Sequence, residues 1–421
     1  MSRWSERHAE EYLLNLELFG MRFGLERMHR LTTALGMPQR RFAHVHVVGS
    51  NGKSSTVRFI AAILERHALR TGSYTSPHLE RFRERIEVAE APISAERFAA
   101  AVQRSAEAAD LVERAAPSPA DVVTQFEALT AAAFQELAAS QVDAAVVEAG
   151  LGGRYDATNV IPSKVQVLTG VGLEHTRWLG PTIADIAAEK LAIVRDHATL
   201  VIPPDLHPDA RAVAEQVATD RHARLVVAPG APEPSTLTLR ARGSFQRRNF
   251  ALACAAAEAF LERPLDLAAV EAAAAETRIP GRLEIVAERP LTLYDGAHNP
   301  AGATALAAAL PEVLGDRRPL VLVISVLEDK AAADMLRPLL PLADHLIFTR
   351  CANPRALSPA TLESLAQQLD GPGAEIVADP NAALQRARDL AGAAGAVLAT
   401  GSIYLVADLV RQANDTRASH L

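Results

Sequence analysis

The chain has 421 residues, of which 49% are hydrophobic and 22% are charged; this is ordinary for a soluble globular protein, and at about 150 residues per domain it predicts two or three domains. The net charge of −7 argues against a general nucleic-acid or anionic-membrane surface, and no apolar run is long enough to span a bilayer. Two cysteines are too few for a disulfide framework or a structural zinc site, so we expect a cytoplasmic protein. From the charge and the lack of a long apolar run we expect no nucleic-acid or membrane partner.

Two short amphipathic helices are predicted within Ser5–Gly36. The first carries Leu13 and Phe19 on one apolar face, and the second ends at Gly36 and Pro38, which are typical helix-stop residues.

The next stretch has the order strand, glycine loop, helix. A β-branched run from Val45 to Val48 precedes the loop GSNGKSS at residues 49–55. Glycines let backbone N–H groups approach phosphate oxygens, and the helix N-terminus adds partial positive charge. Lys53 supplies a mobile charge, and a hydroxyl beside it can face Mg²⁺. The full Walker pattern has a glycine where Val47 stands, so a tight strand-to-helix turn is the alternative interpretation.

Glu80–Val88 is predicted as a strand with Phe82 and Ile86 on its buried face and Arg85 on a solvated face. Helices are predicted at residues 94–112, 124–140, 181–194 and 249–262, and strands at residues 143–148, 165–169, 199–202 and 225–227.

The second half changes character after Arg282. A strand at Leu291–Tyr294 opens a repeated strand–helix alternation, with further strands predicted at residues 320–325, 345–349, 375–377 and 396–400. This α/β alternation predicts a mostly parallel sheet covered on both faces. We place a linker near Val286–Pro290, which divides the chain into an ATP-binding domain, residues 1–287, and a smaller Rossmann-like C-terminal domain, residues 288–421.

Polar side chains gather where predicted strands end, which is where open α/β sheets bind ligands. The phosphate loop follows one strand, Glu148 ends another, and His175 lies just past a third. A carboxylate beside a phosphate loop suits a nucleotide-bound Mg²⁺, because this hard cation prefers oxygen ligands. Imidazole is a less usual Mg²⁺ ligand, and Lys190 would by itself favour the helix dipole, so on residue type alone structural roles for His175 and Lys190 stay open.

Several short motifs are spread along the chain: Gly49–Lys53, Ser76–Leu79, Glu148–Arg154 with Asp156–Asn159, Glu174-His175, Glu189-Lys190, Gly281-Arg282 and Asp295–Pro300. Together they resemble the folylpolyglutamate synthase/dihydrofolate synthase family of the Mur ligase superfamily, over nearly the whole chain from Phe23 to Leu405. The second and third motifs distinguish the folate branch from cell-wall Mur ligases. Ser54 departs from that branch, which usually has glycine there.

The resemblance implies a Mur-ligase-like P-loop ATPase domain and three groups of site residues. Those that would bind ATP are Gly49, Asn51, Gly52, Lys53, Ser54, Ser55, Asn249, Arg282 and Asp295. Those that would hold Mg²⁺ are Ser76, Glu148 and His175. Those that would serve catalysis are Lys53, His298 and Lys190, the last carbamylated by CO₂, which requires a lowered lysine pKa because only the free amine reacts.

The implied activity is ATP-dependent amide ligation. ATP would phosphorylate the carboxylate of dihydropteroate or of the glutamate tail of a reduced folate, and the α-amine of L-glutamate would attack the acyl phosphate. Closure of two domains would shield this intermediate from water, and His298 is a candidate base for the amine. We expect a monomer.

Three rival hypotheses remain at this point. A Mur-type ligase for UDP-linked precursors would carry a large N-terminal domain, for which residues 1–43 are too short. A P-loop NTPase that drives motion would not need Asp295 and His298 in a second domain. A nucleotide-binding regulator would bind ATP without turnover.

Overall fold

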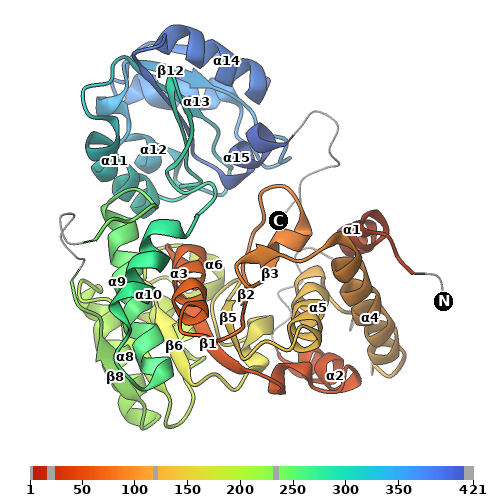
Figure 1. Ribbon diagram of the computed structural model, residues 1–421. Coiled ribbons are helices and arrows are strands. Elements are labelled where there is room, and N and C mark those ends of the chain that lie inside the picture. Colours follow the sequence, from red (N-terminus) through yellow and green to blue (C-terminus); the bar gives the residue numbers. More distant parts are fainter. Residues whose placement is uncertain (1–2, 17–23, 117–121, 231–236, 412–421) are drawn as a thin grey trace.

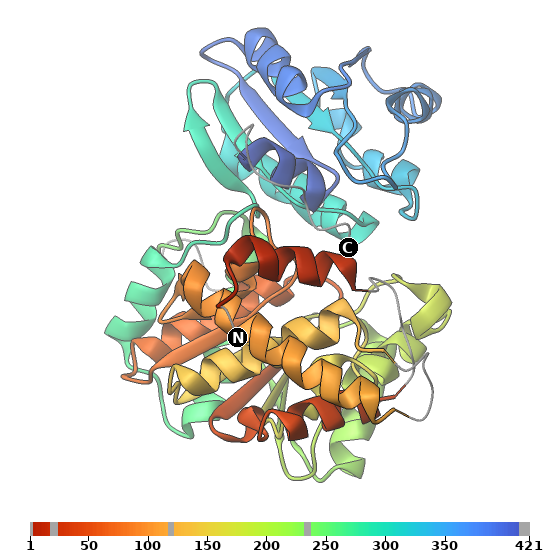
Figure 2. The same cartoon turned by 90° about the vertical axis from the view of Figure 1, so that its right-hand side faces the viewer.

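The computed structural model describes residues 3–16, 24–116, 122–230 and 237–411, and it contains two α/β units, each built around one sheet (Figure 1). Phe19 and Phe23 lie outside the described residues. Figure 2 shows the second unit seated above the first, with the red helix α1 (Glu6–Asn15) on the near side of the seam.

The first sheet has eight strands in the order β4-β3-β2-β5-β1-β6-β7-β8. β1 pairs in parallel with β5 and β6, which sets Val47 opposite Glu148. Only the β2-β3-β4 edge is antiparallel. The strands are β1 (Ala43–Val48), β2 (Thr71–Tyr74), β3 (Ile86–Val88), β4 (Ala91–Pro92), β5 (Ala144–Glu148), β6 (Val165–Leu168), β7 (Thr199–Ile202) and β8 (Arg224–Val227).

Both faces of this sheet are covered, as the apolar strands predict. Side chains that alternate along β1 and β5 pack on one face against α3, α9 and α10. On the other face, α4 and α5 cover β2 and β5, and α7 and α8 cover β6 and β7. The helices are α1, α2 (Glu26–Ala34), α3 (Lys53–Glu65), α4 (Ala95–Arg114), α5 (Gln125–Ala139), α6 (Thr176–Leu179), α7 (Ile183–Leu191), α8 (Pro208–Asp220), α9 (Ser244–Leu261) and α10 (Leu267–Glu276), with short 3₁₀ turns η1 (Pro38–Arg40), η2 (Phe82–Arg85) and η3 (Ala157–Val160).

The second sheet has six strands in the order β13-β12-β11-β14-β10-β9, all parallel except β9. The predicted α/β class is therefore confirmed in both units. The elements are β9 (Glu284–Glu288), β10 (Leu291–Tyr294), α11 (Pro300–Leu314), β11 (Leu320–Ile324), α12 (Ala332–Leu336), η4 (Leu340–Leu342), β12 (His345–Phe348), α13 (Pro359–Gln368), β13 (Ala374–Ile376), α14 (Pro380–Ala391), β14 (Ala396–Thr400) and α15 (Ile403–Val410).

Two local predictions are wrong. Glu80–Val88 is not one strand, because η2 occupies Phe82–Arg85 and only β3 is extended. The tight turn rotates Arg85 inward, so its side chain is 1% exposed instead of solvated. The expected linker begins inside β9, which pairs antiparallel with β10. The division of the chain at 287/288 stays a prediction; β9, which has residues on both sides of it, belongs to the second sheet.

None of the helices in the described ranges is long and apolar enough to cross a membrane.

The interior of the first unit contains two histidines on β1. His46 Nε2 lies 2.8 Å from Thr158 Oγ1, while His46 Nδ1 and His44 Nε2 are buried without a partner in the described residues. Burial lowers the pKa of His44 to about 4 and that of His46 to about 3. Both imidazoles are therefore neutral in the folded chain at physiological pH.

These histidines predict a loss of stability in acid. Unfolding returns each imidazole to a pKa near 6.5, so between about pH 4 and 6.5 the unfolded chain binds more protons, and the free energy of unfolding falls as the pH falls. The variant His46→Asn removes one such group, and the slope of unfolding free energy against pH should drop by about 1.4 kcal/mol per pH unit. Urea unfolding at a series of pH values measures this slope, and an unchanged slope contradicts the assignment.

Candidate active site

A cavity of about 410 Å³ lies between the carboxyl edge of the first sheet and the second domain. It brings together every predicted site residue except Gly49. The carbonyl of Gly49 accepts hydrogen bonds from two lysines that do line the cavity, Lys53 and Lys190. The predicted residues that line it are Asn51, Gly52, Lys53, Ser54, Ser55, Ser76, Glu148, His175, Lys190, Asn249, Arg282, Asp295 and His298.

The loop between β1 and α3 has the conformation of a phosphate-binding turn. Gly52, the residue before the helix, has φ +82° and lies so close to Asn249 that a Cβ would be 2.6 Å from Asn249 Oδ1. Lys53 Nζ donates to the carbonyl of Gly49 at 3.0 Å, folding back over its own loop. The helix N-terminus then points its free N–H groups into the cavity, where phosphate oxygens are favoured.

A second lysine, Lys190, also donates a hydrogen bond to the phosphate loop. Lys190 is 2% exposed, and its Nζ donates to Gly49 O and to Glu174 Oε1, each at 3.0 Å. Burial lowers the pKa of Lys190, while the charge of Glu174 opposes this shift. Burial works to raise the pKa of Glu174, but the charges of Lys190 and Lys53 outweigh it and bring it to about 2. Glu174 is therefore ionised. Burial instead destabilises the charged form of Lys190, which is why the pKa of Lys190 is lowered.

Glu148, the last residue of β5, is an acid in the cavity wall that the first sheet provides. It is 2% exposed, and its two oxygens accept hydrogen bonds from Ser54 Oγ and from the backbone N–H of Ser76, both at 3.1 Å. Burial raises its pKa, and the charge of Lys53 and these two hydrogen bonds oppose the rise. The hydroxyl of Ser54, where the folate branch usually has glycine, thus touches the predicted metal-binding acid directly.

These donors can be tested for fit to Mg²⁺. Among the described residues no group of three or more His, Cys, Asp or Glu side chains converges, so an all-protein cage is absent there. Mg²⁺ binds through one or two carboxylates plus substrate phosphates and water; Glu148 and the nearby serine hydroxyls fit that pattern, and His175 would add a less usual nitrogen ligand. His175 has φ +47° at the start of α6, and burial lowers its pKa, which keeps the imidazole neutral and able to coordinate.

The second domain supplies the opposite wall of the cavity, here called its roof. Asp295, directly after β10, is 3% exposed and accepts backbone bonds from Leu283 and Ala297, each at 2.8 Å. Burial raises its pKa, and the charge of Arg282 opposes this. Nδ1 of His298 lies 2.9 Å from Gly296 O, and a carbonyl only accepts, so Nδ1 carries the proton and Nε2 presents a lone pair. Burial lowers the His298 pKa to about 4.

One side-chain pair joins the two domains at the phosphate loop. The amides of Asn51 and Asn299 exchange two hydrogen bonds, at 3.2 Å and 2.9 Å. Asn299 also caps α11 by accepting from Gly302 N at 2.8 Å. A helix of the second domain is therefore fixed directly against the loop of the first.

Sequence reasoning missed two other residues at this seam. Glu174 was noted only as part of a motif, although it is the partner of Lys190. Arg85 donates from Nε to His78 Nδ1 at 3.0 Å, and its guanidinium lies 5.3 Å from the ring of Phe82. The alternation of charged and apolar residues masked Arg85, because a 3₁₀ turn changes which side chains point inward. The ring of Phe126, at the start of α5, packs against Gly150 at the cavity edge.

Residues 281–403 match the family model described as Mur ligase, glutamate ligase domain. A parallel sheet with a phosphate loop, roofed by such a domain, defines an ATP-dependent acid–amino-acid ligase of the Mur type. The chain is 37% identical over 388 residues to a dihydrofolate synthase/folylpolyglutamate synthase from Mycobacterium tuberculosis, covering 83% of this chain and 78% of that one. It belongs to the folylpolyglutamate synthase/dihydrofolate synthase family of ATP-dependent glutamate ligases.

Other relatives agree. A Bacillus subtilis dihydrofolate synthase/folylpolyglutamate synthase is 34% identical, with 93% of this chain and 95% of that one covered. The solved Mycobacterium tuberculosis folylpolyglutamate synthase complexed with ADP and AMPPCP is similar with a TM-score of 0.88 at 32% identity, covering 97% of this chain and 99% of that one.

The amide pair between the domains predicts a measurable coupling. A double-mutant cycle of Asn51→Ala and Asn299→Ala should give a coupling energy of about 0.5–1.5 kcal/mol in urea unfolding, the usual net value of a hydrogen bond. Loss of the α11 cap affects Asn299→Ala alone and cancels in the cycle. Asn51→Ala combined with Asn381→Ala, an exposed residue on α14, serves as the control and should be additive. Additivity in the first cycle contradicts the link.

Proposed function

We propose that this chain uses ATP to add L-glutamate to dihydropteroate, to the glutamate tail of a reduced folate, or to both. The observation that carries the proposal is the single cavity in which the phosphate loop, Glu148 and Lys190 face Asp295 and His298 of the other domain. A motor or switch NTPase needs no such roof. Amide synthesis does, because a reactive acyl phosphate must be kept from water.

The nucleotide would bind between the loop and the roof. The backbone N–H groups and side chains of Gly49, Asn51, Gly52, Lys53, Ser54 and Ser55 would hold the phosphates, and Asn249, Arg282 and Asp295 would bind the nucleotide from the far side. The close approach of Asn249 to Gly52 supports this, since it joins the two sets at the start of the phosphate loop.

We assign Ser76, Glu148 and His175 to Mg²⁺. When bound, the ion would neutralise charge on the phosphate oxygens. The Ser54 hydroxyl orients one oxygen of Glu148 and the Ser76 backbone orients the other, so the carboxylate is held in place before any ligand arrives.

The reaction would proceed in two displacements. The substrate carboxylate oxygen attacks the γ-phosphorus and ADP leaves, while Lys53 stabilises charge on the transferred group. The glutamate amine nitrogen then attacks the acyl carbon, phosphate leaves, and the amine loses a proton. Nε2 of His298 is our candidate acceptor for that proton, because Nδ1 donates to Gly296 O and leaves the Nε2 lone pair free.

Lys190 would carry a carbamate. Its neutral amine would attack CO₂, form a nitrogen–carbon bond and release a proton. Burial at 2% exposure and the lowered pKa favour the free amine that this step needs. The new carboxylate would replace the ammonium beside Gly49 and serve near the phosphates. A cytoplasmic, monomeric enzyme with no nucleic-acid or membrane partner completes the proposal.

A substrate panel tests the function. The purified chain with ATP, Mg²⁺ and L-glutamate should release ADP only when dihydropteroate or tetrahydrofolate is added, each supplied separately. The variant Lys53→Ala should lose at least about a hundredfold in kcat, the scale expected when one preorganised charge is removed from a transition state. Arg350→Ala, on the second domain, is the control and should keep full activity. ADP release without glutamate or pterin acid would identify an NTPase instead.

Chemical rescue tests the role of Lys190. Lys190→Ala removes the group that would become a carboxylate, so its activity should fall steeply and return in part with added acetate or formate. Lys53→Ala, which lacks the other cavity lysine, should not respond to the same acids. Full activity of Lys190→Ala without any addition, or equal rescue of both variants, excludes the carbamate role.

A further inference from the structure

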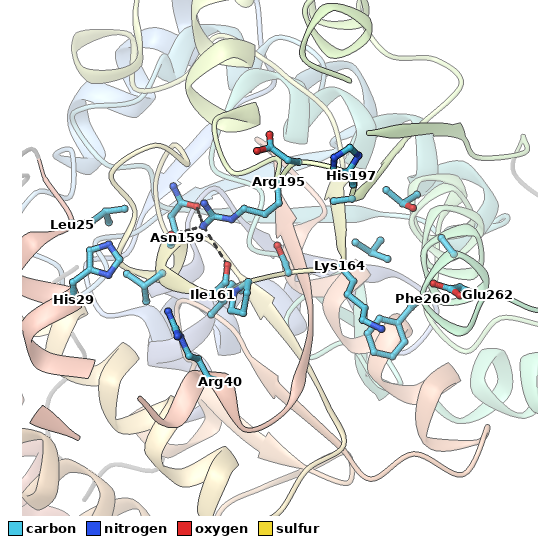
Figure 3. Close-up of a pocket in the computed structure, with 18 residues that line it drawn as sticks. Leu25, His29, Arg40, Asn159, Ile161, Lys164, Arg195, His197, Phe260 and Glu262 are labelled. Carbon is cyan, nitrogen blue, oxygen red and sulfur yellow. Dashed lines mark hydrogen bonds between the residues drawn. The ribbon is translucent and has the colours of Figure 1, made fainter. Parts of the chain in front are cut away.

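A second cavity, of about 680 Å³, lies at the opposite edge of the first sheet, where the strands begin (Figure 3). Its walls come from α2 and η1, from the segment after η3, from the loop between α7 and β7, and from the end of α9. None of the predicted site residues lines it. Its volume is within the range of sites for small organic molecules.

Three cations surround this cavity without a carboxylate partner. Arg40, Lys164 and Arg195 come from three different segments, and Figure 3 shows them placed around Ile161. Among the described residues none of the three forms an ion pair. Of the two acids in the lining, Asp196 pairs with Arg221 at 3.2 Å and its charge also acts on Arg195, so two carboxylates face three cations. The cavity therefore carries an excess of positive charge.

Arg195 is fixed in position before any ligand binds. Its Nη2 donates to Asn159 O at 2.6 Å, to Asn159 Oδ1 at 2.8 Å and to Ile161 O at 3.2 Å. Its Nε is buried without a partner in the described residues, and burial lowers the guanidinium pKa. A guanidinium stays protonated in proteins, and this half-buried charge has no ion-pair partner among the described residues, although the charge of Asp196 acts on it from a greater distance.

Apolar side chains also line the cavity, among polar and charged ones. Leu25 and the ring of Phe260, both half-buried, provide hydrophobic surface between the charged residues. A free inorganic ion would leave this surface in water, whereas an organic anion would cover it and reach more than one cation at once. From the charges and the apolar surface we propose that this cavity binds a small organic anion that carries at least two carboxylate or phosphate groups.

The position separates this ligand from the substrates. Val165 at the start of β6 lines the second cavity, while Thr169 after its end lines the nucleotide cavity. Lys190, in the last turn of α7, likewise lines the nucleotide cavity, and Arg195, in the loop after α7, lines the second cavity. The ligand would therefore bind together with nucleotide, as an effector, on segments that also hold the phosphate loop.

Isothermal titration calorimetry of the full chain tests the site. Excess ADP fills the phosphate loop, Mg²⁺ is left out because both probes chelate it, and citrate and inorganic tripolyphosphate are the two probes, which separate carboxylate from phosphate chemistry. At least one should bind with a stoichiometry near one, and its affinity should fall with added salt. Binding is read without turnover, so the result does not depend on catalysis.

Charge-removing variants locate the site. Arg40→Gln combined with Lys164→Gln should weaken the bound probe about tenfold, the effect of two partly exposed ion pairs. Both side chains are exposed and form no described hydrogen bond or ion pair, so folding should be intact. Arg337→Gln with Arg350→Gln makes the same charge change on the second domain and should leave binding unchanged. Failure of both probes to bind, or equal weakening in the two double variants, overturns the proposal.

Discussion

The buried side chain of Lys190, an ammonium before any carbamate forms, makes the interaction that positions the phosphate loop. It joins the carbonyl of Gly49, at the start of the phosphate loop, to the carboxylate of Glu174, on a different strand connection. Removing either partner would leave a charge or a carbonyl buried and unsatisfied, which costs more than an exposed ion pair could return. The loop, the acid and the helix α7 are therefore positioned together rather than separately.

The remainder of the site follows from where parallel strands end. β1, β2, β5 and β6 finish at one edge, so the loop, Ser76, Glu148 and Thr169 reach one cavity although they are far apart in the chain. β10 ends toward the same space from the other sheet and delivers Asp295. The paired amides of Asn51 and Asn299 then link the two edges at the phosphate loop. Strand ends of two sheets that face one cavity suit a reaction with three substrates and a water-sensitive intermediate.

Sequence patterns succeeded where a strong local signal existed. The limits of β7, β10 and β14 were predicted to the residue, because short apolar runs were bounded by turn residues. Prediction failed where the tertiary context overrode the pattern. Arg85 belongs to a 3₁₀ turn and is buried, and the charged residues of β9 form a strand because β10 offers an edge to pair with. Neither outcome is encoded in hydrophobic periodicity.

The sequence by itself determined the class of site, since the glycine loop with Lys53 and the strand-end acid Glu148 specify which chemistry is possible. It also specified the alternation that builds a parallel sheet. Only the tertiary structure decided the partners: Ser54 with Glu148, Glu174 with Lys190, Asn299 with Asn51, and the group of unpaired cations at the far edge. Such pairs depend on the register of strands and the packing of one domain on another, and these are long-range properties that local residue patterns do not contain.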